Sequence, residues 1–488
     1  MLFALLLVVA ATMYFFQLGR AGFDDAEAYS AYIASRKSIR AVFDASLNLD
    51  PGKGGGLYVF ALHWYSGIVG TSEAALRAFS AAFALASMML VFALAAELFG
   101  AETALLAAAL WAFNPIALIV ARWARMYSMF IALTIGSLLA MRKLQQRPTA
   151  LRVVVFGVLA AAMLYTHLGA ALMLGAEAAL LVRDRRRGRS IFAGCLGMAI
   201  ALLLFTPLAP VALAQIHASA LGHRFDWIGS ARHTPLALKI AGSIVGGAIG
   251  LFLVLGPPMR FDHVRANPFD DSEPLRWCAI WSILPLMALM LGSLLLHPMF
   301  QIRYIAPVTA GFALLTAASL NFAASRIRNL AAVAIASAFL VVAVLFHLYH
   351  QPFDLWRRVA SAVDAVNSPS QTVFFEAGYV MGISQATDLD PDALIQVLPD
   401  GYLRIPFDYY FAGSNPRAAI NPFHPSNARE NLAQAAQRDG GAWLVSHLSD
   451  EDLAAELPLR NTFYLDRIID DTSVSVSLYH IVPRDAHH

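Results

Sequence analysis

Charged residues are scarce in this chain. Only 14% of its 488 residues are Asp, Glu, Lys or Arg, and 58% are hydrophobic. In a typical soluble domain about 25% of the residues are charged. This balance excludes a soluble globular protein. The sequence therefore predicts a polytopic α-helical membrane protein.

Cysteine and the common catalytic motifs are also nearly absent. Both cysteines, Cys195 and Cys278, fall inside apolar runs, which excludes a disulfide framework and a Cys-based metal site. There is no HExxH motif, Walker loop, G-x-S-x-G motif or Gly-rich dinucleotide turn, and residues 52–56 lack the Lys-Ser/Thr pair that a P-loop requires. No cofactor is predicted, and a divalent cation requirement stays open.

Long apolar runs account for most of the chain. A membrane-spanning helix needs about 20 mostly apolar residues. Eleven spans are predicted, at 1–19, 74–98, 102–120, 126–142, 151–167, 168–182, 190–213, 236–256, 277–296, 304–323 and 330–349. The first lacks a basic n-region and is expected to be retained as a span. Residues 57–69 are too short and polar to span, and we expect them to lie in the membrane interface.

Basic residues gather in three of the short loops. The clusters are Arg142, Lys143, Arg147 and Arg152, then Arg183, Arg185, Arg186, Arg187 and Arg189, then Arg326 and Arg328. If the spans alternate, all three clusters share one side, which the positive-inside rule makes cytoplasmic. The loop 20–73 and the tail after residue 349 then face the periplasm, across a bacterial inner membrane.

The tail has a different pattern from the rest of the chain. Helical patterns at 354–359 and 427–437 alternate with strand-like runs at 372–375, 443–446 and 473–482. A region of this size can build its own core. We therefore predict a transmembrane domain over 1–349 and a soluble periplasmic α/β domain over 350–488.

Three carboxylates, Asp24, Asp25 and Glu27, follow the first predicted span. Ionised groups beside hydrocarbon are costly, and a neutral loop would serve equally well as a connector. The three acids are therefore either solvated loop residues or the chemical centre of a membrane enzyme.

Cationic and aromatic residues occupy three further outer turns. The candidates for substrate binding are Arg122, Arg125, Tyr127, His167, Arg303 and Tyr304. One interpretation is snorkelling arginines beside interfacial aromatic anchors. The other is a phosphate clamp, because guanidinium groups pair bidentately with phosphate oxygens. For His167 the alternatives are a hydrogen-bonded packing residue and a catalytic residue.

The order of these segments is informative. Between the acidic pair and the tail come segments 70–80, 97–100, 122–127, 166–167 and 303–307, and Asp354-x-Trp356-Arg357 opens the tail. This order resembles the glycosyltransferase C superfamily, in particular its bacterial branch related to protein O-mannosyltransferases and lipid A aminoarabinose transferases. The resemblance covers nearly the whole chain up to Arg358, and the tail more loosely.

The resemblance implies a glycosyltransferase that moves a sugar from a polyprenyl-phosphate carrier to a lipid, glycan or protein acceptor on the periplasmic side. Asp24 matches the first acid of the family's Asp-Glu pair and is the expected catalytic base. Asp25 replaces the Glu, and Trp123 stands where relatives often carry another Glu. The expected partners are the donor, the acceptor and membrane lipids, without nucleic acid.

Two other classes of protein remain open. A transporter or flippase of a lipid-linked glycan is one, although the predicted spans carry few charges at mid-membrane, where transporters use them for coupling. Glu177 is the exception. A non-catalytic assembly protein of the cell envelope is the other.

Overall fold

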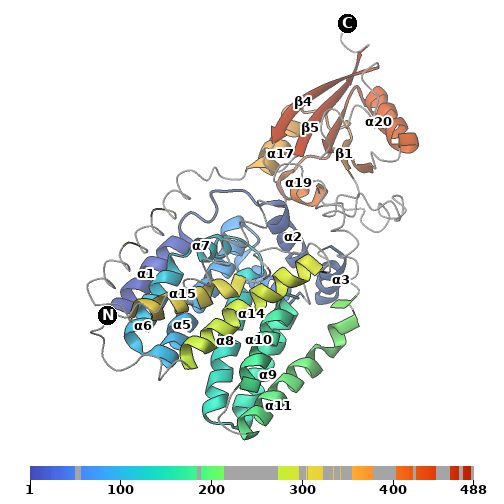
Figure 1. The fold of residues 1–488 in the computed structure, drawn as a ribbon. Coiled ribbons are helices and arrows are strands. Elements are labelled where there is room, and N and C mark those ends of the chain that lie inside the picture. Colours follow the sequence, from blue (N-terminus) through green and yellow to red (C-terminus); the bar gives the residue numbers. More distant parts are fainter. Residues whose placement is uncertain are drawn as a thin grey trace. The chain divides into compact units, whose positions relative to one another are not determined.

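The computed structural model describes residues 1–49, 56–183, 188–210, 212–213, 273–295, 304, 306–321, 334, 341, 354–376, 403–420, 425–446, 462–471 and 476–484. The chain divides into two compact units (Figure 1). The first contains Met1–Gly19 and the described residues between Ile33 and Gln351. The second joins Arg20–Tyr32 to the described part of Pro352–His488. Residues Arg20–Tyr32, which contain Asp24, Asp25 and Glu27 and are called the acidic segment below, therefore belong to the same unit as the tail.

The first unit is helical. Its helices are α1 (Leu2–Phe15), α3 (Ile39–Leu49), α4 (Leu57–Val69), α5 (Glu73–Phe99), α6 (Ala101–Ala112), α7 (Pro115–Ala121), α8 (Tyr127–Gln146), α9 (Ala150–Thr166), α10 (Ala170–Arg183), α11 (Gly188–Phe205), the 3-10 turn η1 (Thr206–Leu208), α14 (Glu273–Leu295) and α15 (Ala306–Asn321). The helix α2 (Asp25–Ala34) connects the two units.

Several of these helices suit a membrane. Among the described residues, α5, α8, α11 with η1, and α14 are long and apolar enough to cross it, and the bent pair of α6 and α7 makes a fifth candidate. A multi-pass helical membrane protein, as the composition predicts, is therefore confirmed. The number of eleven spans stays a prediction. The predicted span at 236–256, and all but two residues of that at 330–349, lie outside the described residues.

Local sequence signals set the helix ends. The Ser72 hydroxyl accepts a hydrogen bond from the Ala75 N–H and caps α5, whose end is followed by Gly100 with φ of +89°. Asn114 caps α7 in the same way, with Pro115 at its first position. The chain bends by 60° between α6 and α7, because a helix seldom continues through the residue before a proline.

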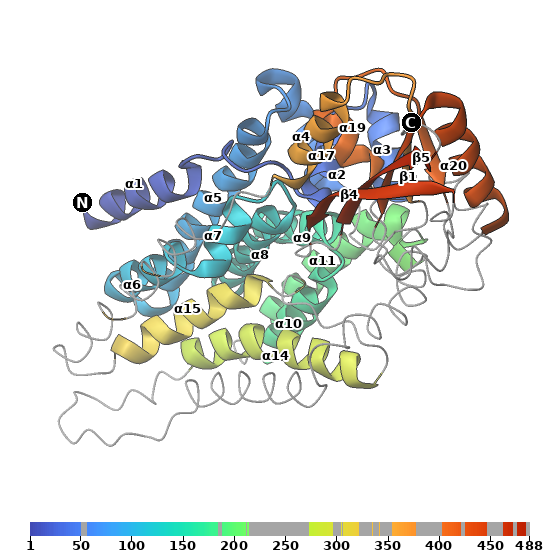
Figure 2. The same ribbon diagram turned by 90° about the horizontal axis from the view of Figure 1, so that it is seen from above.

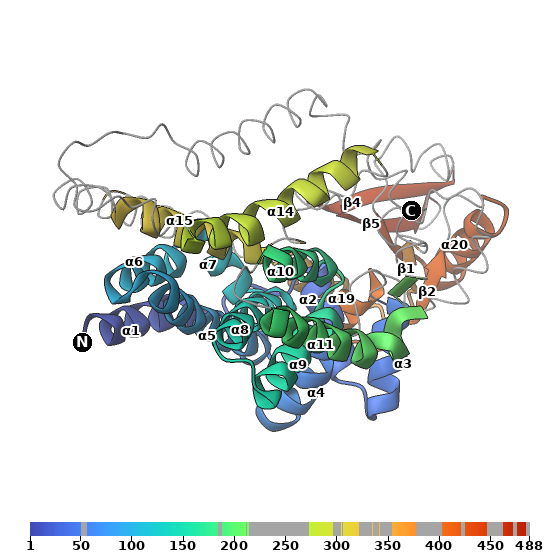
Figure 3. The ribbon, with the colours of Figure 1, turned by 60° about the horizontal axis from the view of Figure 1, so that its bottom comes forward.

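The helices of the first unit pack in layers. The helix α5 contacts α6 and α8, and α9 packs between α8 and α11. The helices α14 and α15 pack on each other and run along α10 and α6 respectively (Figure 2, Figure 3). Two polar contacts join neighbouring helices: the Trp111 indole donates to the Ser87 hydroxyl at 3.0 Å, and Arg142 of α8 pairs with Glu273 of α14 at 2.9 Å.

The second unit is an α/β domain. Its elements are α17 (Leu355–Ala365), β1 (Val373–Glu376), α19 (Arg404–Tyr410), β2 (Arg417–Ile420), α20 (Pro425–Asp439), β3 (Ala442–Ser446), β4 (Phe463–Asp471) and β5 (Val476–Pro483). The strands form one sheet in the order β2-β1-β3-β5-β4. The strand β1 is parallel to β2 and β3, and β5 is antiparallel to β3 and β4.

Helices cover both faces of this sheet (Figure 1). Successive side chains of a strand point to opposite faces, so Val373 and Phe375 pack in a core with α17 and α19, while Phe374 packs in a second core with α20. The predicted strand runs at 372–375, 443–446 and 473–482 correspond to β1, β3 and β5. The helical patterns in the tail correspond to α17 and α20.

Candidate active site

Asp24 stands at the N-terminus of α2. Its carboxylate Oδ1 accepts a hydrogen bond from the Glu27 N–H at 2.7 Å. In return, Glu27 Oε2 accepts from the Asp24 N–H at 3.2 Å. This is a capping box with an Asp in the capping position, and it satisfies two of the N–H groups that a helix start leaves unpaired. The side chain predicted to be the base is thus held by its own helix.

Asp25 is the first residue of α2 and is hydrogen-bonded to the tail domain. The indole Nε1–H of Trp356 donates to Asp25 Oδ1 at 2.6 Å. Burial raises the pKa of Asp25 to about 6, and the bond from Trp356 partly opposes this rise because it stabilises the charged form. Asp25 is therefore a carboxyl group that titrates close to neutrality.

The chain on both sides of the acidic pair is also held within the second unit. The Phe23 N–H donates to the Tyr410 hydroxyl at 2.6 Å, and the Phe23 ring lies 5.0 Å from that of Tyr409. Arg357 donates to the carbonyl oxygen of Arg20 at 3.3 Å. The acidic segment is consequently part of the folded tail domain, and its backbone is fixed at several points.

Arg122, one of the predicted phosphate ligands, lies at the end of α1. Its Nη1 donates to the carbonyl oxygens of Phe16 and, at 3.4 Å, Met13, and its Nη2 donates to that of Gln17 at 3.4 Å. These carbonyls are among those that a helix end leaves unpaired. Partial burial and the neighbouring charge of Arg77 lower the pKa of Arg122. Arg122 thus stabilises the C-terminal end of α1.

Arg125 lies in the turn between α7 and α8 and is 2% exposed. Its carbonyl oxygen accepts from the Ser80 hydroxyl at 3.3 Å, and its N–H donates to the Trp123 carbonyl at 2.6 Å. The Trp123 ring stacks on that of Tyr127, with centroids 5.0 Å apart. The turn is therefore tightly packed and carries a buried guanidinium group.

His167 is the centre of an aromatic cluster in the first unit. Its ring stacks on Phe130 at 5.1 Å and contacts Tyr127 at 5.7 Å and Tyr304 at 5.4 Å. Its Nδ1 accepts from the Gly169 N–H at 2.9 Å, so a neutral ring carries its proton on Nε2. A Cβ on Gly169 would collide with the Tyr304 carbonyl oxygen. The structure thus brings together three of the predicted site residues: Tyr127, His167 and Tyr304.

The other predicted site residues are not all described, and they do not all belong to one unit. Arg303 lies outside the described residues. Asp24 and Asp25 belong to the second unit, and the arginine and aromatic candidates that the structure describes belong to the first. Within the described part of the chain, no three or more His, Cys, Asp or Glu side chains are grouped to hold a metal ion.

Three residues that hold the acidic pair, Glu27, Trp356 and Tyr410, are not among the predicted site residues. Glu27 could have been found, because an acid three residues after a capping Asp is a recognised helix-start pattern. Trp356 and Tyr410 lie 331 and 387 positions from their partners, and no local pattern connects residues so far apart.

Known proteins show which fold this is. Residues 56–210 match the model of the dolichyl-phosphate-mannose-protein mannosyltransferase family. The crystal structure of apo ArnT from Cupriavidus metallidurans is similar to the chain, with a TM-score of 0.58 and 14% sequence identity, over 98% of this chain and 97% of ArnT. The chain has a glycosyltransferase C fold.

Further structures agree with this fold. ArnT from Cupriavidus metallidurans bound to undecaprenyl phosphate matches with a TM-score of 0.55 and 14% identity, over 98% of this chain and 97% of that one. The Archaeoglobus fulgidus oligosaccharyltransferase in complex with Zn and sulfate matches with a TM-score of 0.52 and 14% identity, over 95% and 72%. No curated protein sequence is significantly similar. The resemblance to the glycosyltransferase C superfamily is confirmed.

Proposed function

We propose that this protein is a membrane glycosyltransferase that transfers a sugar from a polyprenyl-phosphate-linked donor to a lipid, polysaccharide or protein acceptor of the cell envelope. The observation that supports it most is the likeness of nearly the whole chain to ArnT, a protein whose structure is also solved with undecaprenyl phosphate bound. A hydrocarbon-embedded helical unit is the environment that a polyprenyl tail requires.

The chemistry assigns distinct roles to the candidate residues. An acceptor hydroxyl attacks the anomeric carbon of the sugar, the new C–O bond forms, and the bond to the carrier phosphate breaks. Asp24 accepts the hydroxyl proton. It takes the proton as the C–O bond forms. Positioning of the acceptor hydroxyl against the anomeric carbon supplies much of the acceleration. Well-oriented reactants can lower an activation barrier by up to roughly 7–11 kcal/mol.

Cationic side chains bind the departing phosphate and stabilise its negative charge. Arg125 and Arg303 are the candidates, since guanidinium groups bind phosphate oxygens in a planar, bidentate manner. The contacts of Arg122 with the end of α1 favour a structural role for that residue. Tyr127, His167 and Tyr304 are proposed to line the donor site, because they already form one cluster.

The orientation follows from the charge distribution. Eleven spans over 1–349, with the basic loops in the cytoplasm, place the loop 20–73 and the domain 350–488 in the periplasm of a bacterial inner membrane. Inclusion of Arg20–Tyr32 in the same compact unit as the tail supports a common compartment for both.

The proposed function is tested by measuring the release of the carrier lipid, undecaprenyl phosphate, from its sugar. Purified protein in detergent is incubated with undecaprenyl-phosphate mannose and an extract of cell-envelope lipids and glycans, and free undecaprenyl phosphate is measured by mass spectrometry. Because mannose is one sugar of several, envelope lipids and glycans from cells with and without the protein are compared in parallel to identify the sugar and the acceptor. No carrier release and no change in any envelope glycan would refute the proposal.

A further inference from the structure

Two helices of the tail domain hold the acidic segment. From α17, the Trp356 indole N–H donates to Asp25 Oδ1 at 2.6 Å, and the adjacent Arg357 donates to the Arg20 carbonyl oxygen at 3.3 Å. From α19, the Tyr410 hydroxyl accepts from the Phe23 N–H at 2.6 Å. The two residues that flank Asp24 in the chain, Phe23 and Asp25, are therefore each hydrogen-bonded to a different helix.

The helix α17 is a rigid support. Trp356 is fully buried and packs in the core that α17 forms with α19 and the sheet, together with Val359 and Phe407. A side chain enclosed in this way has no alternative rotamer without disturbing its neighbours. The direction of the indole N–H towards Asp25 is therefore fixed by the core of the domain.

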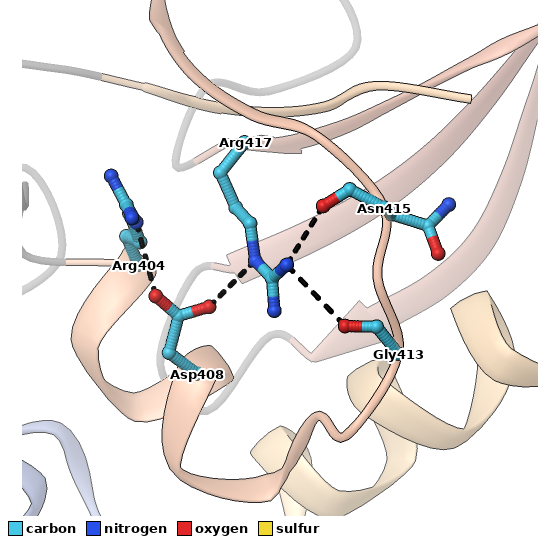
Figure 4. Close-up of polar contacts among 5 residues, drawn as sticks. All are labelled: Arg404, Asp408, Gly413, Asn415 and Arg417. Carbon is cyan, nitrogen blue, oxygen red and sulfur yellow. Dashed lines mark hydrogen bonds and ion pairs between the residues drawn. The ribbon is translucent and has the colours of Figure 1, made fainter. Parts of the chain in front are cut away.

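The helix α19 is held by ion pairs. Asp408 accepts from Arg404 at 3.0 Å and from Arg417 of β2 at 2.9 Å (Figure 4). Arg417 also donates to the carbonyl oxygens of Asn415 and Gly413, at 2.7 and 3.4 Å (Figure 4). Because one guanidinium group joins α19, the following turn and the edge strand, Tyr410 is presented from a fixed helix.

We propose that Trp356 and Tyr410 are positioning residues for the acidic pair, so that the tail domain sets the geometry of the reacting carboxylate. This inference rests on the proposed function. Neither residue is proposed to touch the substrate: each acts through the backbone or side chain of a neighbour of Asp24. A displacement of a catalytic group by about 1 Å costs on the order of a hundredfold in rate, which is the effect these contacts prevent.

In the chain, Asp25 follows Asp24 and lies two residues before Glu27, and its partner Trp356 is followed by Arg357, which pairs with Asp354. Burial is the main cause of the raised pKa of Asp25, and the Trp356 N–H lowers it. Removal of that N–H therefore raises the pKa of Asp25 further. Asp25 adjoins the proposed base in the chain, so its charge is part of the proposed site, and the pH dependence of the rate is a readout that a merely structural role of Trp356 would not change.

The experiment compares Trp356→Phe and Tyr410→Phe with matched controls, using the release of undecaprenyl phosphate from undecaprenyl-phosphate mannose. Trp356→Phe should lower kcat about ten- to hundredfold, and Tyr410→Phe about three- to tenfold, with smaller changes in KM. Ile481→Val disturbs the other core of the domain, between the sheet and α20, and Tyr464→Phe removes a hydroxyl from β4. Both controls should stay within about twofold of the unsubstituted protein once melting temperatures are matched.

Two further measurements separate positioning from packing. In Trp356→Phe the acid limb of kcat/KM should move to higher pH, while Ile481→Val should leave it in place. In a double-mutant cycle, Trp356→Phe should add little to the loss already caused by Asp25→Ala, because the indole acts through that carboxylate. An unmoved acid limb together with additive losses would overturn the inference.

The outcomes also separate this inference from the proposed function. If the unsubstituted protein releases carrier and both variants match their controls, the inference alone is wrong. If the unsubstituted protein releases none, from this or any other polyprenyl-phosphate sugar, both fail. Should Trp356→Phe not accumulate, Tyr410→Phe decides, since it removes one hydroxyl from a partly exposed ring and leaves the core intact.

Discussion

Asp24 and Glu27 cap each other's backbone. Asp24 Oδ1 accepts from the Glu27 N–H at 2.7 Å, and Glu27 Oε2 accepts from the Asp24 N–H at 3.2 Å. Glu27 is buried, so this pairing is shielded from water. The proposed base therefore has a fixed rotamer, at the end of a helix where the dipole favours negative charge.

This geometry makes Asp24→Asn an informative variant. Asn is as good a capping residue as Asp, so the start of α2 should persist and the protein should accumulate. Loss of the general base should lower the transfer rate about 10²- to 10⁴-fold. The measurement is carrier release by the purified variant, with its melting temperature beside it. Normal turnover would show that Asp24 is not the base.

Glu27→Gln and Glu27→Ala form a matched pair for the cap itself. Gln keeps an oxygen that accepts from the Asp24 N–H, whereas Ala leaves that N–H without its side-chain acceptor. We expect Glu27→Ala to lower the free energy of unfolding by about 1 kcal/mol and to slow transfer, and Glu27→Gln to change both much less. Equal effects of the two substitutions in melting and activity assays would contradict a capping role.

Asp25 should make the stability of the protein depend on pH. Its pKa is about 6 in the folded protein against 3.8 ordinarily, so the folded protein keeps a proton that the unfolded chain has lost. Stability therefore falls as pH rises through this interval, and the cost persists above about pH 6.

Asp25→Asn removes this cost and keeps an oxygen for the Trp356 N–H. At neutral pH the variant should be more stable by about 1–3 kcal/mol, allowing for partial exposure, with little difference near pH 4. Thermal unfolding at several pH values measures the difference. A gap that does not change with pH would mean that Asp25 titrates normally in the folded protein.

Substitutions of Arg122 and Arg125 should have different effects on stability and on carrier binding. Arg122→Ala removes donors to the end of α1 and should lower stability by about 1–3 kcal/mol, with little change in carrier affinity. Arg125→Ala should weaken binding of undecaprenyl phosphate about ten- to hundredfold, and Arg125→Lys should restore it only partly, because Lys lacks the planar fork. A binding titration with undecaprenyl phosphate, paired with melting curves, decides. Full rescue of Arg125 by Lys would indicate an interfacial anchor.

The common compartment of the acidic loop and the tail domain can be tested by thiol labelling. Ser38 and Ser370 are exposed, so cysteines at these positions report on the compartment that they face. In a Cys195→Ala, Cys278→Ala background, single cysteines at Ser38 and Ser370 should both react with an impermeant reagent in cells with a permeabilised outer membrane. A cysteine at Ala150, beside a basic loop, should stay unlabelled. Labelling of only one of the first two would refute the proposed topology.

Local sequence was sufficient for most of the elements. The apolar runs predicted helices that correspond to α1, α5, α8, α9, α10, α11, α14 and α15, because hydrophobic length and helix capping are properties of adjacent residues. The tail strands β1, β3 and β5 were recognisable for the same reason. The strand β4 was not singled out, since charged residues and a register shift between Arg467 and Ile469 interrupt its alternation.

The partners of the charged residues depended on the tertiary structure. From sequence, Arg122 was either a snorkelling residue or a phosphate ligand, yet the fold placed it against the carbonyls at the end of α1. The acidic pair was visible as a pattern, but its contacts with Trp356 and Tyr410 required the tail domain to fold around Arg20–Tyr32. Hydropathy and capping act over a few residues, whereas the partner of a buried charge is chosen by which distant segments the packed core brings within hydrogen-bond distance.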